Sequence, residues 1–139
     1  TPHVGYFGDM MATFADLAGA RLPAGLDSLS LVPTLLGRGV QARHDYLYWE
    51  FYESGFSQAV LVDGRWKGIR LKSPSAPIQV FDLAADPGEA TDVAIREPAL
   101  ARRIAAIMRE AHVDNEHWKW PAASAPPPRA PGPGTRRSP

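Results

Sequence analysis

The chain has 139 residues, 45% of them hydrophobic and 22% charged, which is typical of a globular protein with one compact domain. Fifteen basic residues balance fifteen acidic ones, so the chain lacks the net positive charge of nucleic-acid platforms and polybasic membrane binders. The absence of cysteine excludes disulfides, thiolate nucleophiles and Cys-ligated metals.

The first predicted element is a helix over residues 10–18. Asp9 is a good N-cap and Gly19 a good stop signal for it. Its apolar side chains recur at helical spacing: Met10, Phe14, Leu17 and Ala18. Such a helix needs a partner for its apolar stripe.

A second, short helix is predicted over residues 31–36. Ser30 suits the N-cap, Pro33 the first turn and Gly37 the position beyond the last turn. The sequence therefore begins with a helical segment.

The stretch over residues 46–52 alternates in the manner of a strand. One set of side chains is predicted to point inward: Leu47, Trp49 and Phe51. The other set points the opposite way: Tyr46, Tyr48, Glu50 and Tyr52.

A hairpin follows, with strands predicted over residues 58–62 and 65–71. They flank Asp63 and Gly64, the strongest short hairpin signal that a sequence offers. Residues 78–83 form the next predicted strand.

The last predicted element is a helix over residues 98–113, with Pro98 in its first position. It carries an apolar stripe made of Leu100, Ile104, Ile107, Met108 and Ala111. The stripe is expected to pack on the apolar face of the sheet.

These elements predict an α+β fold: a small antiparallel β-sheet of about four strands packed by a C-terminal helix, with an N-terminal helical segment. One core is expected to hold Trp49, Phe51, Ile104 and Ile107. Residues 1–120 form this subdomain, and the Pro, Ala, Gly and Arg-rich residues 121–139 are predicted to be a flexible tail.

Membrane and export signals are not expected. No apolar run approaches the ~20 residues that cross a bilayer. The first residues lack the basic region and apolar stretch of a signal peptide, and localisation is left open.

Single motifs give little chemistry. Residues 37–42 match the letters of a dinucleotide fingerprint but follow a helix and lead to a strand, so the match is rejected. No Gly-x-Ser-x-Gly elbow and no triad-like Ser–His pair occur. The histidines show no metal-binding spacing and are expected at the surface: His3, His44, His112 and His117.

Two further groups have alternative interpretations. Four carboxylates surround Pro87 and Gly88, where a turn capped by side chains is favoured over a calcium loop: Asp82, Asp86, Glu89 and Asp92. Three tyrosines on one strand face could stack on sugar rings, or pack on another domain: Tyr46, Tyr48 and Tyr52.

Five blocks taken in order carry a family pattern. They are residues 9–20 (DMMATFADLAGA), 26–37 (LDSLSLVPTLLG), 44–51 (HDYLYWEF), 58–60 with 64–67 (QAV and GRWK), and 80–89 (VFDLAADPGE). Together they resemble the C-terminal portion of the type I, formylglycine-dependent sulfatases of the arylsulfatase family, over residues 1–112. Ser28 stands where that family usually has Gly, and Asp92 where it often has Asn.

The resemblance implies the C-terminal subdomain of the alkaline-phosphatase-like sulfatase fold. That family uses calcium and a formylglycine made from the first residue of Cys-x-Pro-x-Arg or Ser-x-Pro-x-Arg, and the aldehyde hydrate attacks sulfur. The nearest match here, from Ser124 to Arg129, places the arginine one residue too far. No catalytic, cofactor-binding or metal-binding residue is therefore assigned to this chain.

The resemblance also implies the partners and the function. A sulfatase catalytic domain would be the partner, with a sulfated substrate possible at the pocket rim and neither nucleic acid nor membrane involved. The expected function is the structural C-terminal part of a sulfuric ester hydrolase, inactive alone. The alternatives are a stand-alone carbohydrate-binding or interaction module and a truncated product without function.

Overall fold

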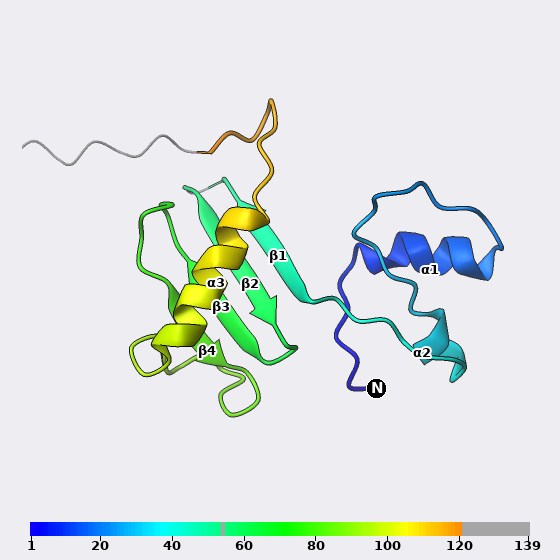
Figure 1. Cartoon of the computed structure of the whole chain (residues 1–139), viewed down its shortest axis with the longest axis horizontal. Coiled ribbons are helices and arrows are strands. Elements are labelled where there is room, and N and C mark those ends of the chain that lie inside the picture. The colour runs from blue at the N-terminus through cyan, green and yellow to red at the C-terminus, as the bar shows by residue number, and fades with distance from the viewer. Residues whose placement is uncertain (54, 121–139) are drawn as a thin grey trace, which may run out of the picture.

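The structure is a computed structural model that describes residues 1–53 and 55–120. The described residues form three helices and four strands. In chain order they are α1 (Asp9–Leu17), α2 (Val32–Leu36), β1 (Tyr46–Phe51), β2 (Ser57–Val62), β3 (Trp66–Arg70), β4 (Gln79–Asp82) and α3 (Pro98–Glu110). Figure 1 shows α1 and α2 lying together, while α3 crosses one face of the sheet. The predicted tail lies outside the described residues.

The sheet is an antiparallel meander in which neighbours in the chain are neighbours in space, in the order β1-β2-β3-β4. Its register places Tyr48 opposite Val60 and Gly68 opposite Val80. In the hairpin between β2 and β3, Asp63 and Gly64 both have positive φ angles, of 56° and 64°. Such a pair suits the tight two-residue turn that matches strand twist. The predicted α+β fold class is confirmed.

The core lies between the sheet and α3. Its fully buried side chains come from β2, β4 and α3: Val60, Val62, Val80, Ile104 and Met108. Leu100 and Ile107 pack against this cluster from the same helix. The predicted apolar stripe of the last helix therefore does cover the sheet.

The predicted inward face of β1 is wrong. Tyr48 packs against the core cluster, whereas Phe51 is 60% exposed. Tyr48 lies opposite Val60, which faces α3, so alternation places Trp49 and Phe51 on the opposite face. A tyrosine can take the inner position because its hydroxyl is hydrogen-bonded.

The helix ends match the prediction in part. Gly19 and Gly37 both have φ of 64°, the left-handed conformation expected beyond a helix. The N-cap of α1 is Gly8, not Asp9, which lies in the first turn and is buried. Leu31 holds the N-cap position of α2 in place of Ser30.

The last helix is shorter than predicted. It ends at Glu110, and Ala111 takes the C-cap position, so His112 and Val113 lie beyond it. His112 instead contacts Glu50 on β1. A pairing between residues so far apart in sequence leaves no trace in helical periodicity.

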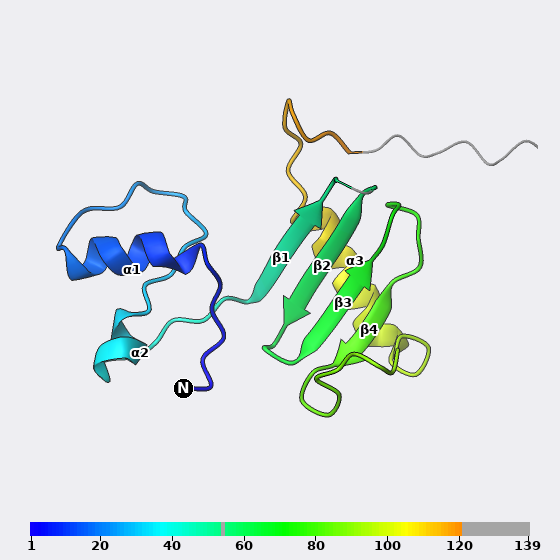
Figure 2. The same ribbon diagram turned by 180° about the vertical axis from the view of Figure 1, so that it is seen from behind.

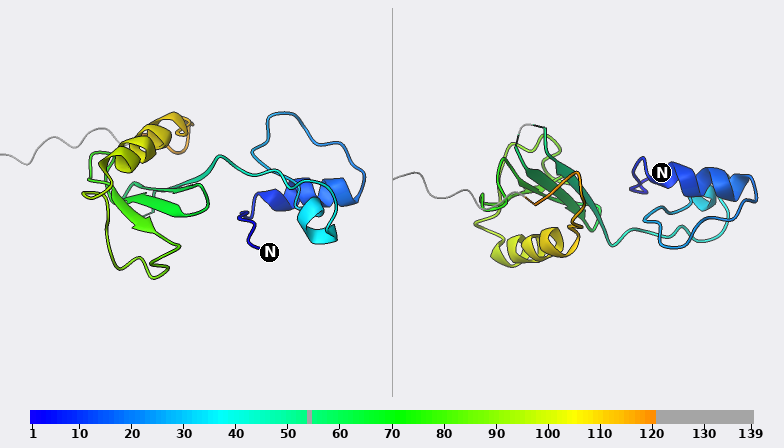
Figure 3. Two further views of the ribbon diagram at one scale, coloured as in Figure 1. Left: turned by 60° about the horizontal axis from the view of Figure 1, so that its bottom comes forward. Right: turned by 90° about the horizontal axis from the view of Figure 1, so that it is seen from above.

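The other face of the sheet has no helix over it among the described residues, as the reverse view in Figure 2 shows. Figure 3 shows the helical segment beside the sheet, with an extended stretch of chain leading into β1. Within residues 1–53 and 55–120, none of the helices is long and apolar enough to cross a membrane.

Candidate functional site

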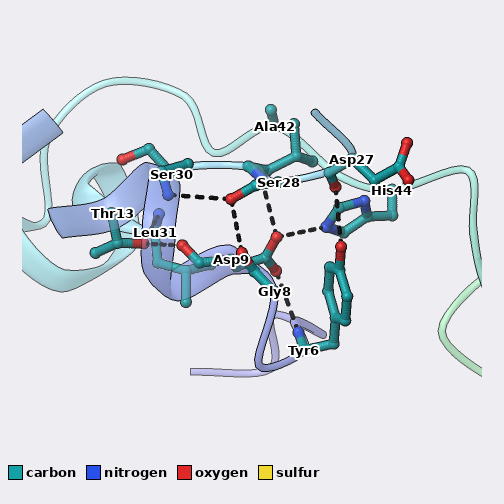
Figure 4. A network of polar contacts seen from close by, with 12 residues as sticks. Tyr6, Gly8, Asp9, Thr13, Asp27, Ser28, Ser30, Leu31, Ala42 and His44 are labelled. Carbon is teal, nitrogen blue, oxygen red and sulfur yellow. Dashed lines mark hydrogen bonds and ion pairs between the residues drawn. The ribbon is translucent and has the colours of Figure 1, made fainter. Parts of the chain in front are cut away.

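The first polar network surrounds the carboxylate of Asp9, which is 0% exposed (Figure 4). Its Oδ2 accepts the backbone N–H of Tyr6 at 3.1 Å. Its Oδ1 accepts the N–H of Leu29 at 2.9 Å and lies 2.9 Å from His44 Nε2. One carboxylate therefore joins the start of α1, the loop before α2 and the segment before β1.

Two hydroxyl groups extend this network. Thr13 Oγ1 donates to the carbonyl of Asp9 at 2.7 Å and accepts the N–H of Leu31 at 3.0 Å. Ser28 Oγ donates to the carbonyl of Gly8 at 2.7 Å and accepts the N–H of Ala12 at 3.0 Å. The face of α1 that looks inward is therefore held by hydrogen bonds.

The environment of Asp9 favours its charged form. Burial by itself would raise the pKa of Asp9, but the hydrogen bonds from Leu29, Tyr6 and His44 outweigh it and lower the pKa. Both oxygens of the Asp9 carboxylate have hydrogen-bond partners, so this side chain holds the surrounding segments together.

The second network surrounds Glu50 on β1. Its carboxylate accepts the hydroxyls of Tyr48 and, at 2.8 Å, Tyr52, and it lies 2.7 Å from His112 Nδ1. Gln58 Nε2 donates both to the Tyr48 hydroxyl at 2.7 Å and to a carbonyl at the end of α3 at 3.0 Å. This network ties the sheet to the end of the last helix.

The second network raises the pKa values of one histidine and two tyrosines. Burial would lower the pKa of His112, but the hydrogen bonds to Asp114 and Glu50 outweigh it and raise the pKa above its ordinary value of 6.5. Burial and the bond to Glu50 raise the pKa of Tyr48, and burial with the same carboxylate raises that of Tyr52 to about 12. Both tyrosines stay neutral hydrogen-bond donors, which makes them poor nucleophiles.

The structure does not bring the four histidines together. The side chains of His44 and His112 are only 13% and 11% exposed, each paired with a carboxylate, so the expected surface position is wrong for both. His117 is exposed beside Glu116. In the part of the chain that the structure describes, no group of three His, Cys, Asp or Glu side chains could hold a metal ion.

The acidic cluster that begins at the last residue of β4 is a capped turn, as predicted. Three of its carboxylates accept hydrogen bonds from backbone N–H groups in the turn or the adjoining strand: Asp82, Asp86 and Asp92. The fourth, Glu89, accepts a hydrogen bond from Lys67 Nζ at 2.6 Å.

The three tyrosines of the first strand do not make an exposed platform. Tyr48 packs on the core, and Tyr46 is 38% exposed at the start of β1. Tyr52 lies beyond the strand, where it bonds to Glu50 and contacts the ring of Trp118. The sugar-stacking face suggested by alternation is therefore not formed by these three rings together.

A cavity lies where the helical segment meets the sheet. Its volume is about 590 Å³, and Tyr6, His44 and Tyr46 contribute to its walls. Its charged lining residues have both signs, Arg43 and Asp45 among them. Acidic residues outnumber basic ones, because Asp27 and Glu110 also line the cavity, so the lining disfavours an anionic substrate.

Sequence reasoning missed both networks. Asp9 and His44 are 35 residues apart, and Glu50 and His112 are 62 residues apart. Neither pair has a spacing that periodicity can detect. Only the fold brings these side chains into contact.

In comparison with known proteins, the chain is similar in sequence to sulfatases. No family model matches the chain. It is 32% identical to arylsulfatase K of Gallus gallus over 110 residues, which is 73% of this chain and 21% of that protein. It is 35% identical to choline-sulfatase of Rhizobium meliloti over 116 residues, 78% of this chain and 22% of that protein. The chain thus spans about a fifth of the length of the curated relatives it matches.

A comparison with solved structures also finds a sulfatase. A 2-O GAG sulfatase matches with a TM-score of 0.64 and 27% identity, over 74% of this chain and 23% of that one. A phosphonate monoester hydrolase of Agrobacterium radiobacter matches with a TM-score of 0.55 and 24% identity, over 76% of this chain and 25% of that one. The second likeness concerns the fold alone.

Proposed function

Because the chain is a homologue of the C-terminal portion of sulfatases, we propose that it serves as the structural C-terminal part of a sulfuric ester hydrolase. In this role it packs on the catalytic domain and contributes no residue to the chemical step. The partner is the remainder of a sulfatase, and a sulfated substrate would lie beyond this chain's own residues or at their rim.

The observation that carries this proposal is the reversed polarity of α1. The face that packs inward holds Asp9, Ala12 and Thr13, which are polar or small. Large apolar side chains point outward instead, and Phe14 is 64% exposed. A helix on the solvent-exposed surface of a protein normally has its polar side facing water. The exposed apolar side of α1 therefore indicates that another protein surface covers this helix.

The exposed apolar side chains of α1, together with Phe7 just before the helix, are here called the α1 stripe: Phe7, Met11, Phe14 and Leu17. Leu35 and Leu36 of α2 are exposed as well. Burial of an apolar side chain of this size is worth about 1.5–3 kcal/mol. Covering the stripe with a second protein surface therefore supplies a large driving force for association.

The uncovered face of the sheet offers a second contact area. Trp49, Leu61 and Ile69 are half-buried on it, and Phe51 is exposed at the end of β1. Sheets that expose an apolar face gain stability when a further layer covers it. The same catalytic domain is proposed to contact this face.

Calcium and formylglycine, which the sulfatase resemblance implies, do not fit the residues of this chain. No three metal-ligating side chains gather in residues 1–53 and 55–120, and the complete sequence has neither form of the formylglycine motif. No step of the reaction is therefore assigned to a residue here.

The test of this function is an activity assay on the isolated chain. We expect no hydrolysis of a chromogenic aryl sulfate above background, with or without calcium, because no nucleophile or metal site is supplied. Turnover that co-purifies with the chain and disappears in the double variant His44→Ala/Glu50→Ala would contradict the proposal. The single variant Asp45→Ala, next to His44 but exposed, serves as the control.

A further inference from the structure

A small groove lies between the end of β1 and the segment that follows α3. Its volume is about 310 Å³. Three rings line it, Phe51, Tyr52 and Trp118, together with the carboxylates of Glu50 and Glu53. This volume is at the lower end of the range for small-molecule pockets, about 300 Å³ and upward.

The rings of the groove have accessible surface and one fixed wall. Phe51 is 60% exposed and Trp118 is 53% exposed. The ring of Tyr52 contacts that of Trp118, with 5.3 Å between their centroids, and the Tyr52 hydroxyl donates to Glu50 at 2.8 Å. The Tyr52 wall is therefore preorganised before any ligand binds.

The charged side chains that line the groove are acidic, and one of them, Glu50, is paired with His112. Two carboxylates line it, and no Lys or Arg is present among its lining residues within the described chain. Both oxygens of Glu50 already accept hydrogen bonds, while Glu53 has no such bond in the described part of the chain. An anionic ligand, such as a sulfate ester, would be repelled here.

We propose that this groove binds a small organic ammonium ion, with the cationic head over the rings of Trp118 and Phe51 and its charge facing Glu53. Aromatic faces attract alkylated ammonium groups, and carboxylates beside the rings add a direct charge interaction. None of these residues belongs to the α1 stripe, but Phe51 also lies on the sheet face proposed to contact a catalytic domain, so the site is tested on this chain alone.

The test is a titration of the complete chain with tetramethylammonium, followed by the indole N–H signals of its tryptophans in NMR spectra. We expect a saturable shift of the Trp118 signal, while the signal of Trp66, which packs on the core, stays in place. Neutral tert-butyl alcohol has a similar shape and is expected to bind at least about tenfold more weakly.

Variants separate the aromatic contribution from the charge contribution. Calorimetry measures the affinity for tetramethylammonium in each variant. Trp118→Leu should weaken binding about tenfold or more, and Glu53→Gln should weaken it about fivefold. Glu116→Gln, on the same segment but outside the groove lining, should leave affinity within about twofold. Circular dichroism identifies any variant that fails to fold. If Trp118→Leu fails to fold, Glu53→Gln still tests the site, because Glu53 is exposed.

Three results would overturn the assignment. They are the absence of a saturable shift, equal affinity for tert-butyl alcohol, and unchanged affinity in both groove variants. The second would make the groove an apolar pocket without selectivity for charge.

Discussion

At the residue scale, Asp9 is the side chain on which the helical segment depends. Its carboxylate satisfies two backbone N–H groups and one imidazole, all of which lie in different segments of the chain. Buried groups of this kind are costly to leave without partners. Ser28, which departs from the glycine usual in the resembled family, supports the same joint through its hydroxyl.

Replacing Asp9 by alanine should lower the free energy of unfolding by about 3 kcal/mol, because it leaves buried donors without an acceptor. Urea unfolding measures this loss. Hydrogen exchange should also show faster exchange of the Leu29 amide, which donates to the lost carboxylate. The exposed neighbour variant Asp45→Ala should cost less than about 0.5 kcal/mol. Equal losses in the two variants would show that the Asp9 network does not brace the segment.

His112 should make stability depend on pH. Its pKa is raised in the folded chain, so its contribution is complete below about pH 6.5 and is lost as the pH rises through the raised value. Urea unfolding across this window should show stability falling towards high pH in the wild type, with a smaller fall in His112→Phe.

His117→Phe is the matched control, since that histidine is exposed and forms an ion pair with its neighbour in sequence, Glu116. Its stability profile should follow the wild type. A His112→Phe profile with the same slope as the wild type would contradict the role of the Glu50–His112 pair.

At the element scale, the sequence predicts element types well and the orientation of one strand poorly. The Asp63–Gly64 turn and the stripe of α3 have local causes, so their predictions hold. In β1, both faces of the strand carry aromatic rings, so the alternating pattern alone does not determine which face packs on α3. The polar partners that make Tyr48 acceptable inside come from Glu50 and from a glutamine ten residues later.

The packing of α3 on β3 depends on Gly68. A Cβ atom at this position would lie 2.4 Å from Ile104 Cγ2, too close for any real contact. Ile104 is fully buried and branched at Cβ, so it cannot move away at low cost. Gly68→Ala should therefore destabilise the chain by about 1–3 kcal/mol in urea unfolding.

A double-mutant cycle checks this cause. In an Ile104→Ala background the clash is removed, so Gly68→Ala should cost much less than it does alone. An additive result would mean that Gly68 acts through strand propensity and not through the contact with α3.

At the scale of the whole molecule, the helical segment and the sheet unit differ in completeness. The sheet and α3 enclose an apolar core, whereas the apolar stripe of α1 is exposed to solvent and the helix packs with the short α2. The reversed polarity of α1 follows from the Asp9 network, which uses its inner face. Sequence periodicity placed Phe14 and Leu17 in the apolar stripe but put Met10 there in place of Met11, and it could not show that the stripe is exposed.

Light scattering over a range of concentrations tests most directly whether the α1 stripe is a surface for another polypeptide. An exposed apolar patch above a few hundred Å² is unusual on a monomer and tends to find a partner. In the absence of a catalytic domain, the wild-type chain is expected to self-associate through the stripe, so its mass should rise with concentration above 15.1 kDa. Phe14→Glu should remain a monomer, whereas Ala20→Glu, which adds the same charge just beyond α1, should behave as the wild type. A wild-type chain that stays monomeric at every concentration would contradict the account.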